Sequence, residues 1–249
     1  MKLLILYLSL VSMLFSMPIE KHKNDTLEKT SVAVITKIDG KAKILSKSSI
    51  KKHKAKLGES LFEGDRLITY MQATVLVELY DSSKIIVAPS SELSFLDKNT
   101  LKQGQGEVYY KIKTRKASQG LKVETPFSIM GIKGTEFIVD SQGQGQIALK
   151  EGLVGIESLY ANFELHKKKV MEEYEKFKSE QNSAFEAYKA ESNGQIIIYV
   201  KAFDLESGKV LNFSQSSECN ESCESKVQEI DISDELNRKF AMYEKMLKE

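Results

Sequence analysis

The chain has 249 residues, 29% of them charged, and its formal net charge at pH 7 is +1, so its overall charge indicates neither a nucleic-acid partner nor an acidic tail. It has no tryptophan and only three histidines, which leaves little material for a histidine-based metal site or for acid–base catalysis. We therefore expect a binding protein rather than an enzyme, with no cofactor, no metal and no bound nucleic acid.

The first residues are typical of a secretory signal peptide. Lys2 precedes an apolar run over residues 3–15, which at ~1.5 Å per residue spans about 20 Å, less than the ~30 Å hydrocarbon core of a bilayer. We expect residues 1–16 to be the signal peptide and residues 17–30 a linker, so that the mature protein is periplasmic or otherwise extracytoplasmic. An uncleaved N-terminal membrane tether stays open as the alternative.

Residues 31–158 alternate between short apolar runs and turn residues, which predicts a mainly β domain of antiparallel strands, a sandwich or a roll. Asp39-Gly40 lies between two such runs and predicts a hairpin. Gly64-Asp65 marks a second turn. In residues 73–80, ATVLVELY, the alternate apolar residues fall on one face, so that face is expected to be buried.

Residues 125–139 read TPFSIMGIKGTEFIV, in which two glycines and a lysine suit either a phosphate-binding loop or a sharp turn. A phosphate-binding loop needs a helix directly after it, whereas β-branched and aromatic residues follow Gly134. We therefore predict a turn between two strands, in which Gly131 and Gly134 can take a positive φ without steric cost. A ligand-binding turn that exposes Lys133 is the second interpretation.

The character of the sequence changes at Tyr160. Residues 162–192 contain no glycine or proline, and their apolar residues recur at helical spacing in one narrow stripe. This pattern predicts a long amphipathic helix with a coiled-coil-like seam, inserted as residues 159–193. Its candidate partner surface consists of Phe163, Val170, Tyr174 and Phe177. The stripe either binds a partner or a second copy of the chain, or packs against the rest of the protein.

After the insertion we expect a returning β hairpin over residues 194–214 and then a loop over residues 215–232. The loop holds the only two cysteines of the chain, Cys219 and Cys223. In an exported protein this pair suits a small disulfide loop. Two free thiols, or half of a structural zinc site without a nearby histidine, are the alternatives.

Residues 233–249 are predicted to form a C-terminal helix. Ser233 suits the N-cap, because its hydroxyl can accept a hydrogen bond from the first turn. Leu236, Phe240, Tyr243 and Leu247 then fall on one face at helical spacing.

The segments of the β region follow one another in a recognisable order: GKAKILS, LGESLFEGDRLIT, ATVLVELYDSSKIIVAPSSELSF, LKQGQGEVYYKI, VETPFSIMGIKGTEFIV and IALKEGLVGIES. This order resembles the FecR domain family of bacterial cell-envelope proteins over about residues 32–157. Its structural motif positions include Gly64, Asp65, Gly131, Gly134, Thr135 and Phe137, and Gly-x-x-Gly-Thr-x-Phe is the most specific part. One position departs from the pattern, because Ser82 follows Asp81 where glycine is expected.

The resemblance implies an extracytoplasmic β domain without a known set of catalytic residues. Founding members of the family pass an iron-uptake signal from an outer-membrane receptor to a sigma factor, through a cytoplasmic segment placed before a membrane helix. The apolar run here starts at Leu3, so we expect no such segment. We expect a binding, sensing or scaffolding module for an envelope protein or polysaccharide. The alternative is a signal transducer related to the iron-uptake regulators.

Overall fold

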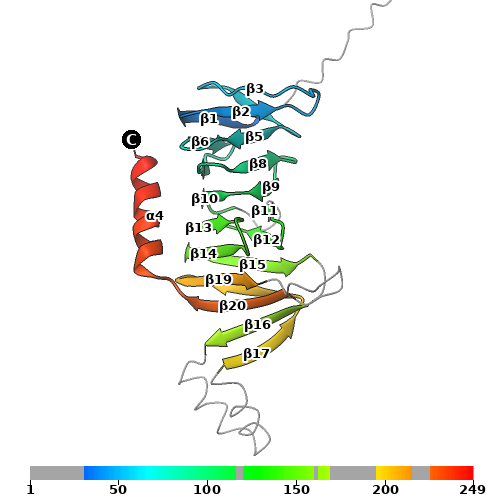
Figure 1. The fold of residues 1–249 in the computed structure, drawn as a ribbon, viewed down its shortest axis with the longest axis vertical. Coiled ribbons are helices and arrows are strands. Elements are labelled where there is room, and N and C mark those ends of the chain that lie inside the picture. The colour runs from blue at the N-terminus through cyan, green and yellow to red at the C-terminus, as the bar shows by residue number, and fades with distance from the viewer. Residues whose placement is uncertain (1–30, 116–119, 160–161, 169–194, 215–224, 249) are drawn as a thin grey trace, which may run out of the picture.

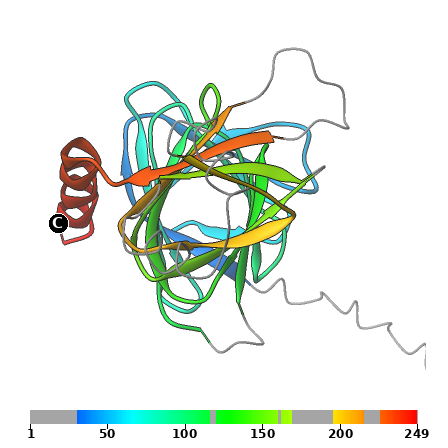
Figure 2. The ribbon, with the colours of Figure 1, turned by 90° about the horizontal axis from the view of Figure 1, so that it is seen from below.

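The computed structural model describes residues 31–115, 120–159, 162–168, 195–214 and 225–248, and nearly all regular elements within them are strands. Two large sheets face each other, and their strands stack along the long axis of the molecule (Figure 1). Seen along that axis, the two sheets surround a common interior (Figure 2). The predicted mainly β fold class is confirmed.

We call the larger sheet, with eleven strands, sheet A. In order across the sheet, its strands are β17 (Gln195–Val200), β16 (Phe163–Lys168), β20 (Ser225–Asp231), β19 (Lys209–Ser214), β14 (Gln146–Glu151), β13 (Thr135–Asp140), β10 (Glu107–Ile112), β7 (Lys84–Val87), β6 (Thr74–Leu79), β1 (Ser31–Asp39) and β4 (Ser60–Phe62).

Sheet B has nine strands. In order they are β18 (Ala202–Glu206), β15 (Leu153–Ser158), β12 (Ser128–Ile132), β11 (Leu121–Glu124), β9 (Thr100–Gln105), β8 (Glu92–Phe95), β5 (Arg66–Thr69), β2 (Ala42–Leu45) and β3 (His53–Lys54). Among the described strands, β9 with β11 and β16 with β20 pair in parallel, and the other neighbours are antiparallel.

The chain passes repeatedly from one sheet to the other, and this corrects the hairpin predicted at Asp39-Gly40. β1 pairs with β4 and β6 in sheet A, whereas β2 pairs with β3 and β5 in sheet B. Gly40 has a φ of 79°, and a Cβ there would lie 2.8 Å from the Cα of Ala73, so the backbone turns a tight corner. Alternation in the sequence predicts which face of a strand is buried but not its partner, so a corner and a hairpin look alike.

The turn at Asp81 to Ser83 is a true hairpin within sheet A. The backbone N–H of Leu79 donates to the carbonyl of Ser83 at 2.9 Å, and the N–H of Ser83 donates to the carboxylate of Asp81 at 3.0 Å. Ser82, where the family pattern has glycine, has a φ of 62°. Glycine takes this conformation without steric cost, so the serine keeps the turn at some local strain.

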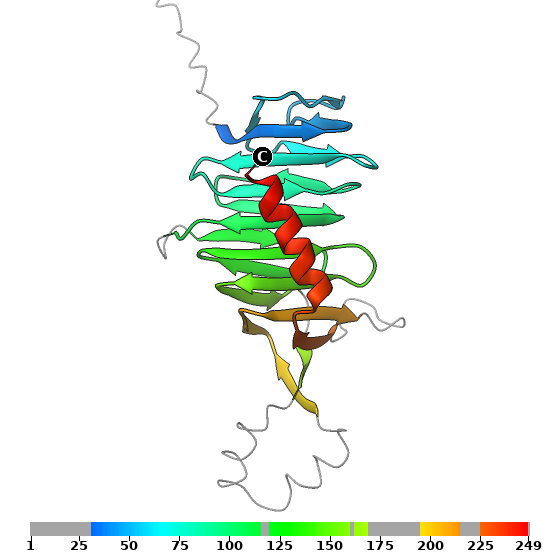
Figure 3. The same ribbon diagram turned by 90° about the vertical axis from the view of Figure 1, so that its left-hand side faces the viewer.

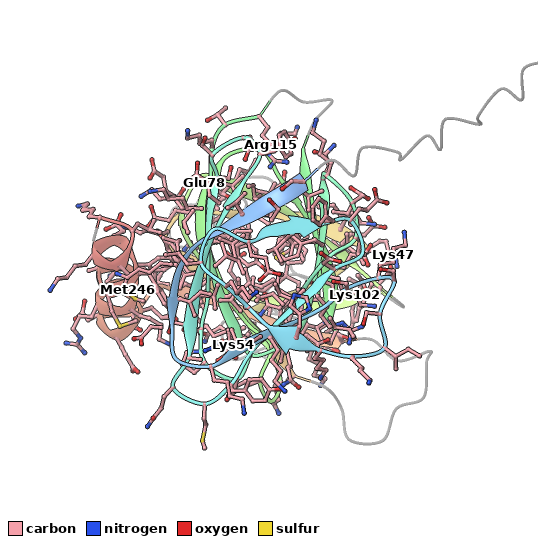
Figure 4. The ribbon with its side chains drawn as sticks, turned by 90° about the horizontal axis from the view of Figure 1, so that it is seen from above. Lys47, Lys54, Glu78, Lys102, Arg115 and Met246 are labelled. Carbon is pink, nitrogen blue, oxygen red and sulfur yellow. The ribbon has the colours of Figure 1, made fainter. Side chains whose placement is uncertain are left out.

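Inward-facing side chains fill the space between the sheets, as the view down the stack shows (Figure 4). The alternate apolar residues of β6, Val75, Val77 and Leu79, are buried as predicted. Tyr110 stacks on Phe137 with ring centroids 4.6 Å apart, and its hydroxyl donates to the side-chain oxygen of Gln103 at 2.9 Å. The core therefore satisfies the polar end of this large aromatic side chain within the protein.

Phe163–Lys168 form strand β16, which corrects the helix predicted to begin at residue 162. β16 pairs with β20 and β17 at the end of sheet A. Phe163 is fully buried, and its ring lies 5.7 Å from that of Phe203 and 6.0 Å from that of Phe213. Phe163 by itself fits the predicted helical stripe, whereas Phe163 and Leu165 together fit a period of two, and both are buried in the shared core of the strands. The rest of the predicted helix, with Val170, Tyr174 and Phe177, lies outside the described residues.

The strands of the following segment extend both sheets and do not form the returning hairpin predicted for residues 194–214. β18 pairs with β15 in sheet B, whereas β19 lies between β14 and β20 in sheet A. Leu205, Leu211 and Phe213 join the same buried core as the strands that precede residue 159. Cys219 and Cys223 lie outside the described residues.

The predicted C-terminal helix is confirmed as α4 (Asp234–Met246), with Ser233 at its N-cap. The hydroxyl of Ser233 accepts a hydrogen bond from the backbone N–H of Leu236 at 3.3 Å. The helix runs along the stack on the outer side of sheet A, across several of its strands (Figures 1 and 3). Within the part of the chain that the structure describes, no helix is long and apolar enough to cross a membrane.

Candidate functional site

The glycine turn of the family motif is a corner between the two sheets. β12 ends at Ile132 in sheet B, and β13 begins at Thr135 in sheet A. Gly134 has a φ of 146°, and a Cβ on it would lie 2.7 Å from the Cα of Thr114. Thr135 and Phe137 are buried next to the corner. This part of the motif therefore has a structural role, with Gly134 as the residue that cannot carry a side chain.

Gly131 does not share this role, which corrects the expectation of a positive φ there. It lies inside β12 and is not among the positive-φ glycines of the described residues. A Cβ on Gly131 would find no atom within 4 Å. The corner therefore does not require glycine at this position.

Gly64 and Asp65 form another corner, between β4 in sheet A and β5 in sheet B. The carboxylate of Asp65 is buried and accepts hydrogen bonds from the backbone N–H groups of Lys47, at 3.3 Å, and Phe62, at 3.0 Å. Gly64 has a φ of 85° and lies against the side chain of Lys47. These two motif residues hold the backbone of the corner.

Arg115 joins two turns at the side of the stack, because it donates hydrogen bonds to Asp81 in one turn and to Asn99, at 3.4 Å, in the turn before β9 (Figure 4). Its side chain is 4% exposed, and its Nε lies 2.5 Å from a carboxylate oxygen of Asp81 in the β6–β7 turn. Burial alone would raise the pKa of Asp81, but hydrogen bonds from Arg115 and Ser83 outweigh it and hold the pKa below its usual range. The carboxylate of Asp81 is therefore charged at neutral pH, and its ion pair with Arg115 has a structural role.

A hollow on the outer face of sheet B is the best candidate for a binding site. Lys122, Gly131, Gly155 and Asp204 are direct neighbours across strands β11, β12, β15 and β18. Two adjoining depressions of about 550 and 730 Å³ share these four residues. In this row two glycines, which have no side chains, lie between a lysine and an aspartate. The floor of the hollow is therefore the backbone of Gly131 and Gly155.

The two glycines of this floor are not needed by the fold. A Cβ on Gly155 would meet its nearest atom, Oδ1 of Asp204, at 3.4 Å, an ordinary contact, and Gly131 has open space above it. Glycine in a strand interior weakens the strand, and it often marks a place where a ligand or another backbone approaches closely. We therefore treat the exposed glycine pair as a functional feature.

Apolar side chains flank the floor. Ile129 lines one depression and Leu153, which is 52% exposed, lines the other. At one end, Lys122 forms an ion pair with Glu124 at 2.8 Å. The hollow thus offers apolar contact in its middle and opposite charges at its two ends.

Sequence reasoning found Gly131 but missed Lys122, Gly155 and Asp204. These residues lie on strands far apart in the chain, and only the pairing of the strands brings them into one row. The signal in the sequence was a glycine at an outward position of a strand. To recognise it, the alternation of inward and outward residues had to be assigned correctly on both strands.

Sheet A has a second notable surface, the face covered by α4. Phe240 and Tyr243 of the helix are buried against Tyr109, with which Tyr243 stacks at a centroid distance of 5.1 Å. Glu136, whose side chain is 3% exposed, bonds to Lys111 at 2.8 Å and Lys150 at 3.1 Å. Both lysines also reach Glu244 of the helix, at 3.4 and 2.8 Å.

The pKa values of these charges follow from their contacts. The hydrogen bond from Lys150 is the largest influence on Glu244 and holds its pKa below the usual glutamate range, against the effect of partial burial. For Lys111 and Lys150, burial alone would lower the pKa, but hydrogen bonds and charge interactions with Glu136 and Glu244 outweigh it and raise both pKa values. Glu244 and the two lysines are therefore charged at neutral pH.

Of the remaining predicted site residues the structure describes only Phe163, because Val170, Tyr174, Phe177, Cys219 and Cys223 lie outside the described residues. Phe163 is buried in the core and is not available as a partner surface. Among the residues that the structure describes, no three His, Cys, Asp or Glu side chains lie close enough together to hold a metal ion.

The fold defines a mainly β protein built from two facing sheets, with candidate binding surfaces on its outer faces. A family model described as "FecR protein" matches residues 65–155, which confirms the resemblance found in the sequence for this part of the chain. The comparison with curated proteins gave no match.

Solved structures with similarity to the chain are distant. The crystal structure of a proposed anti-sigma factor from Parabacteroides distasonis at 1.65 Å resolution has 8% sequence identity and a TM-score of 0.43, covering 67% of this chain. The chain spans 59% of the length of that protein. A cell surface anchoring domain has 23% identity and a TM-score of 0.25, over 26% of this chain and 86% of that one. These similarities are too low for any function to be carried over.

Proposed function

We propose that the protein is an exported, non-enzymatic cell-envelope protein whose FecR domain binds a protein partner at the hollow on sheet B. The observation that carries this proposal is the exposed pair Gly131 and Gly155, which weakens two neighbouring strands without a structural need. A floor made of backbone lets a partner approach closely, and the flanking side chains of the hollow then surround the side chain that the partner inserts.

The lining of the hollow favours a protein over a polysaccharide. Ile129 and Leu153 supply apolar surface beside the glycines, and the charged residues Lys122, Lys133, Glu157 and Asp204 lie around them. An apolar side chain of a partner gains from burial on such a surface. A sugar chain carries many hydroxyl groups, and each one that is buried without a hydrogen bond weakens binding.

The test is to fill the hollow without disturbing the fold. Gly131→Leu and Gly155→Leu, combined in one chain, should leave the melting temperature unchanged or raise it, because neither position needs glycine. The matched control is Ser94→Leu, at an outward position on β8 of the same sheet, outside the hollow. Tagged wild-type, filled and control chains are used to capture proteins from envelope extracts, and the captured proteins are compared by mass spectrometry.

We expect the wild-type and control chains to retain the same protein and the filled chain to lose it by at least about tenfold, the effect of 1.4 kcal/mol of binding free energy. Equal capture of this protein by all three chains would show that the hollow is not its binding site. Sedimentation with purified cell-wall polysaccharide runs in parallel. Binding there that the filled chain loses would overturn the choice of a protein partner.

The alternative function, a signal transducer related to the iron-uptake regulators, is supported by the FecR family match. It predicts that deletion of the gene changes the transcript level of at least one other operon. The chain with Gly131→Leu and Gly155→Leu should then fail to restore that level. A transcript profile unchanged by the deletion under iron limitation would contradict this alternative while leaving the binding proposal in place.

A further inference from the structure

The outer face of sheet A carries an apolar strip that α4 covers. The strip consists of Ile86, Tyr109, Ile138, Ala148 and Val210, which lie on five different strands of the sheet. α4 buries it mainly with Phe240 and Tyr243, while most other side chains of the helix are at least partly exposed. The strip therefore takes two aromatic side chains that are one helical turn apart.

Charged side chains fix the direction in which a helix can lie on this strip. Near the C-terminal end of α4, Glu244 meets Lys111 and Lys150 of the sheet. Closer to the start of the helix, Lys239 meets Glu107 at 2.6 Å, and Glu107 also accepts a hydrogen bond from the hydroxyl of Tyr243. A helix laid in the opposite direction would bring like charges together at both places. The face is thus complementary to one helix sequence in one direction.

Side chains make the contacts between α4 and the sheets. The backbone N–H of Ile232 donates to the carbonyl of Gly208 at 2.8 Å, so the chain is fixed to the β body just before Ser233 starts the helix. After that point, the contacts described above are made by side chains, and Lys84 adds a bond to the carbonyl of Leu247 at 3.4 Å. A helix of 13 residues is marginal on its own, so it needs a surface of this kind to stay folded.

We propose that the strip is also an interaction surface for a second copy of this chain, in which two molecules exchange their α4 helices. The contacts of the exchanged helix would be those already present within one chain, so exchange adds little enthalpic penalty. The intramolecular helix has the advantage of a high effective concentration. Exchange is therefore expected where chains are concentrated, and a mixture of two variants in which only the contacts between different chains are matched should reveal it.

A pair of charge-reversal variants distinguishes the contact of α4 with its own chain from its contact with a second chain. Glu244→Lys gives a helix that repels Lys111 and Lys150 of its own chain, and Lys150→Glu removes the lysine closest to Glu244 and puts a like charge in its place. In an exchanged pair, the native Glu244 of the second variant meets the native lysines of the first. The lysine introduced into the helix of the first variant meets the glutamate introduced into the sheet of the second. Each variant alone is mismatched, and only the mixture restores both contacts.

We expect the equimolar mixture to form dimers with an apparent Kd at least about tenfold below that of either variant alone, measured by light scattering after size-exclusion chromatography. Arg238→Glu on the exposed side of α4 is the control in place of Glu244→Lys, and it should give no dimers when mixed with Lys150→Glu. Circular dichroism of each variant checks that the sheets are folded.

A mixture that remains monomeric, with both variants folded, would overturn the proposal. Equal dimerisation in the control mixture would overturn it as well, because the dimer would then not depend on the exchanged charges. The proposal concerns the face of sheet A, so its failure leaves the partner site on sheet B untouched.

Discussion

At Gly134 the backbone has a φ of 146°, and a Cβ would lie 2.7 Å from the Cα of Thr114. We predict that Gly134→Val lowers the free energy of unfolding by more than ~1 kcal/mol, because valine adds both backbone strain and a collision with the neighbouring backbone. Urea denaturation followed by circular dichroism measures the change.

Gly131 provides the internal control three residues earlier in the same motif. It lies in a strand, and its Cβ position is open, so Gly131→Val should leave the free energy of unfolding unchanged or raise it. If the two valine variants unfold at the same urea concentration, the assignment of separate roles to the two glycines is wrong.

At the scale of the element, β16 joins the core of sheet A through Phe163, which is fully buried against Phe203 and Phe213. Phe163→Ala should lower the free energy of unfolding by about 3 to 5 kcal/mol, the usual cost of deleting a large buried side chain. Ile230→Ala in the neighbouring strand β20 is the control, because Ile230 is 37% exposed. A Phe163→Ala chain that is as stable as the control would return this segment to a surface role.

The docking of α4 should depend on pH at both extremes. The pKa of Glu244 is lowered in the folded protein, so its stabilising contribution is fully present above the ordinary glutamate range, about pH 4.3, and is lost as the pH falls through the lowered value. The pKa values of Lys111 and Lys150 are raised, so their contribution is present below about pH 10.4 and is lost as the pH rises through the raised values.

The ring resonances of Phe240 and Tyr243 in NMR spectra report this docking, since both rings are buried only while α4 lies on sheet A. We expect them to shift towards solvent-exposed values below about pH 4 and above about pH 10.5. Glu244→Gln should weaken the acid-side transition. Ring resonances in the variant that follow the wild-type acid transition would show that another group controls it.

At the scale of the whole molecule, the segment matched by the family model is smaller than the folding unit. Residues 65–155 contain β5 to β14 and the start of β15 but lack β1 and β2 at one end and β18 and β19 at the other, and these pair with β6, β5, β15 and β14. All these strands share one core. We predict that a fragment of residues 65–155 does not fold alone, because both sheets lose strand partners and core side chains.

Circular dichroism and thermal melting of this fragment, beside a chain of residues 31–248, provide the test. We expect a cooperative transition only for the longer chain. A sharp transition in the fragment would mean that the flanking strands extend a domain that is already complete.

Elements that depend on interactions between neighbouring residues were predicted correctly, and elements that depend on residues distant in the chain were not. The alternation of β6 and the capped helix α4 were correctly predicted, because the buried face and the N-cap are properties of neighbouring residues. The corner at Gly40 and strand β16 were not, since both depend on partners distant in the chain. Phe163 alone suited either a strand or the predicted helical stripe, and burial of Phe163 together with Leu165 in the shared core selected the strand.

The sequence by itself determined the β class, the recognisable order of the FecR motif and the amphipathic C-terminal helix, because periodicity, turn residues and caps act over a few residues. Only the tertiary structure decided which strands pair, and with that which outward positions become neighbours. The row from Lys122 to Asp204 and the lysine pair that receives Glu244 exist because distant strands lie in one register. Register is a long-range property that alternating strands do not specify by themselves, and the candidate binding surfaces of this protein depend on it.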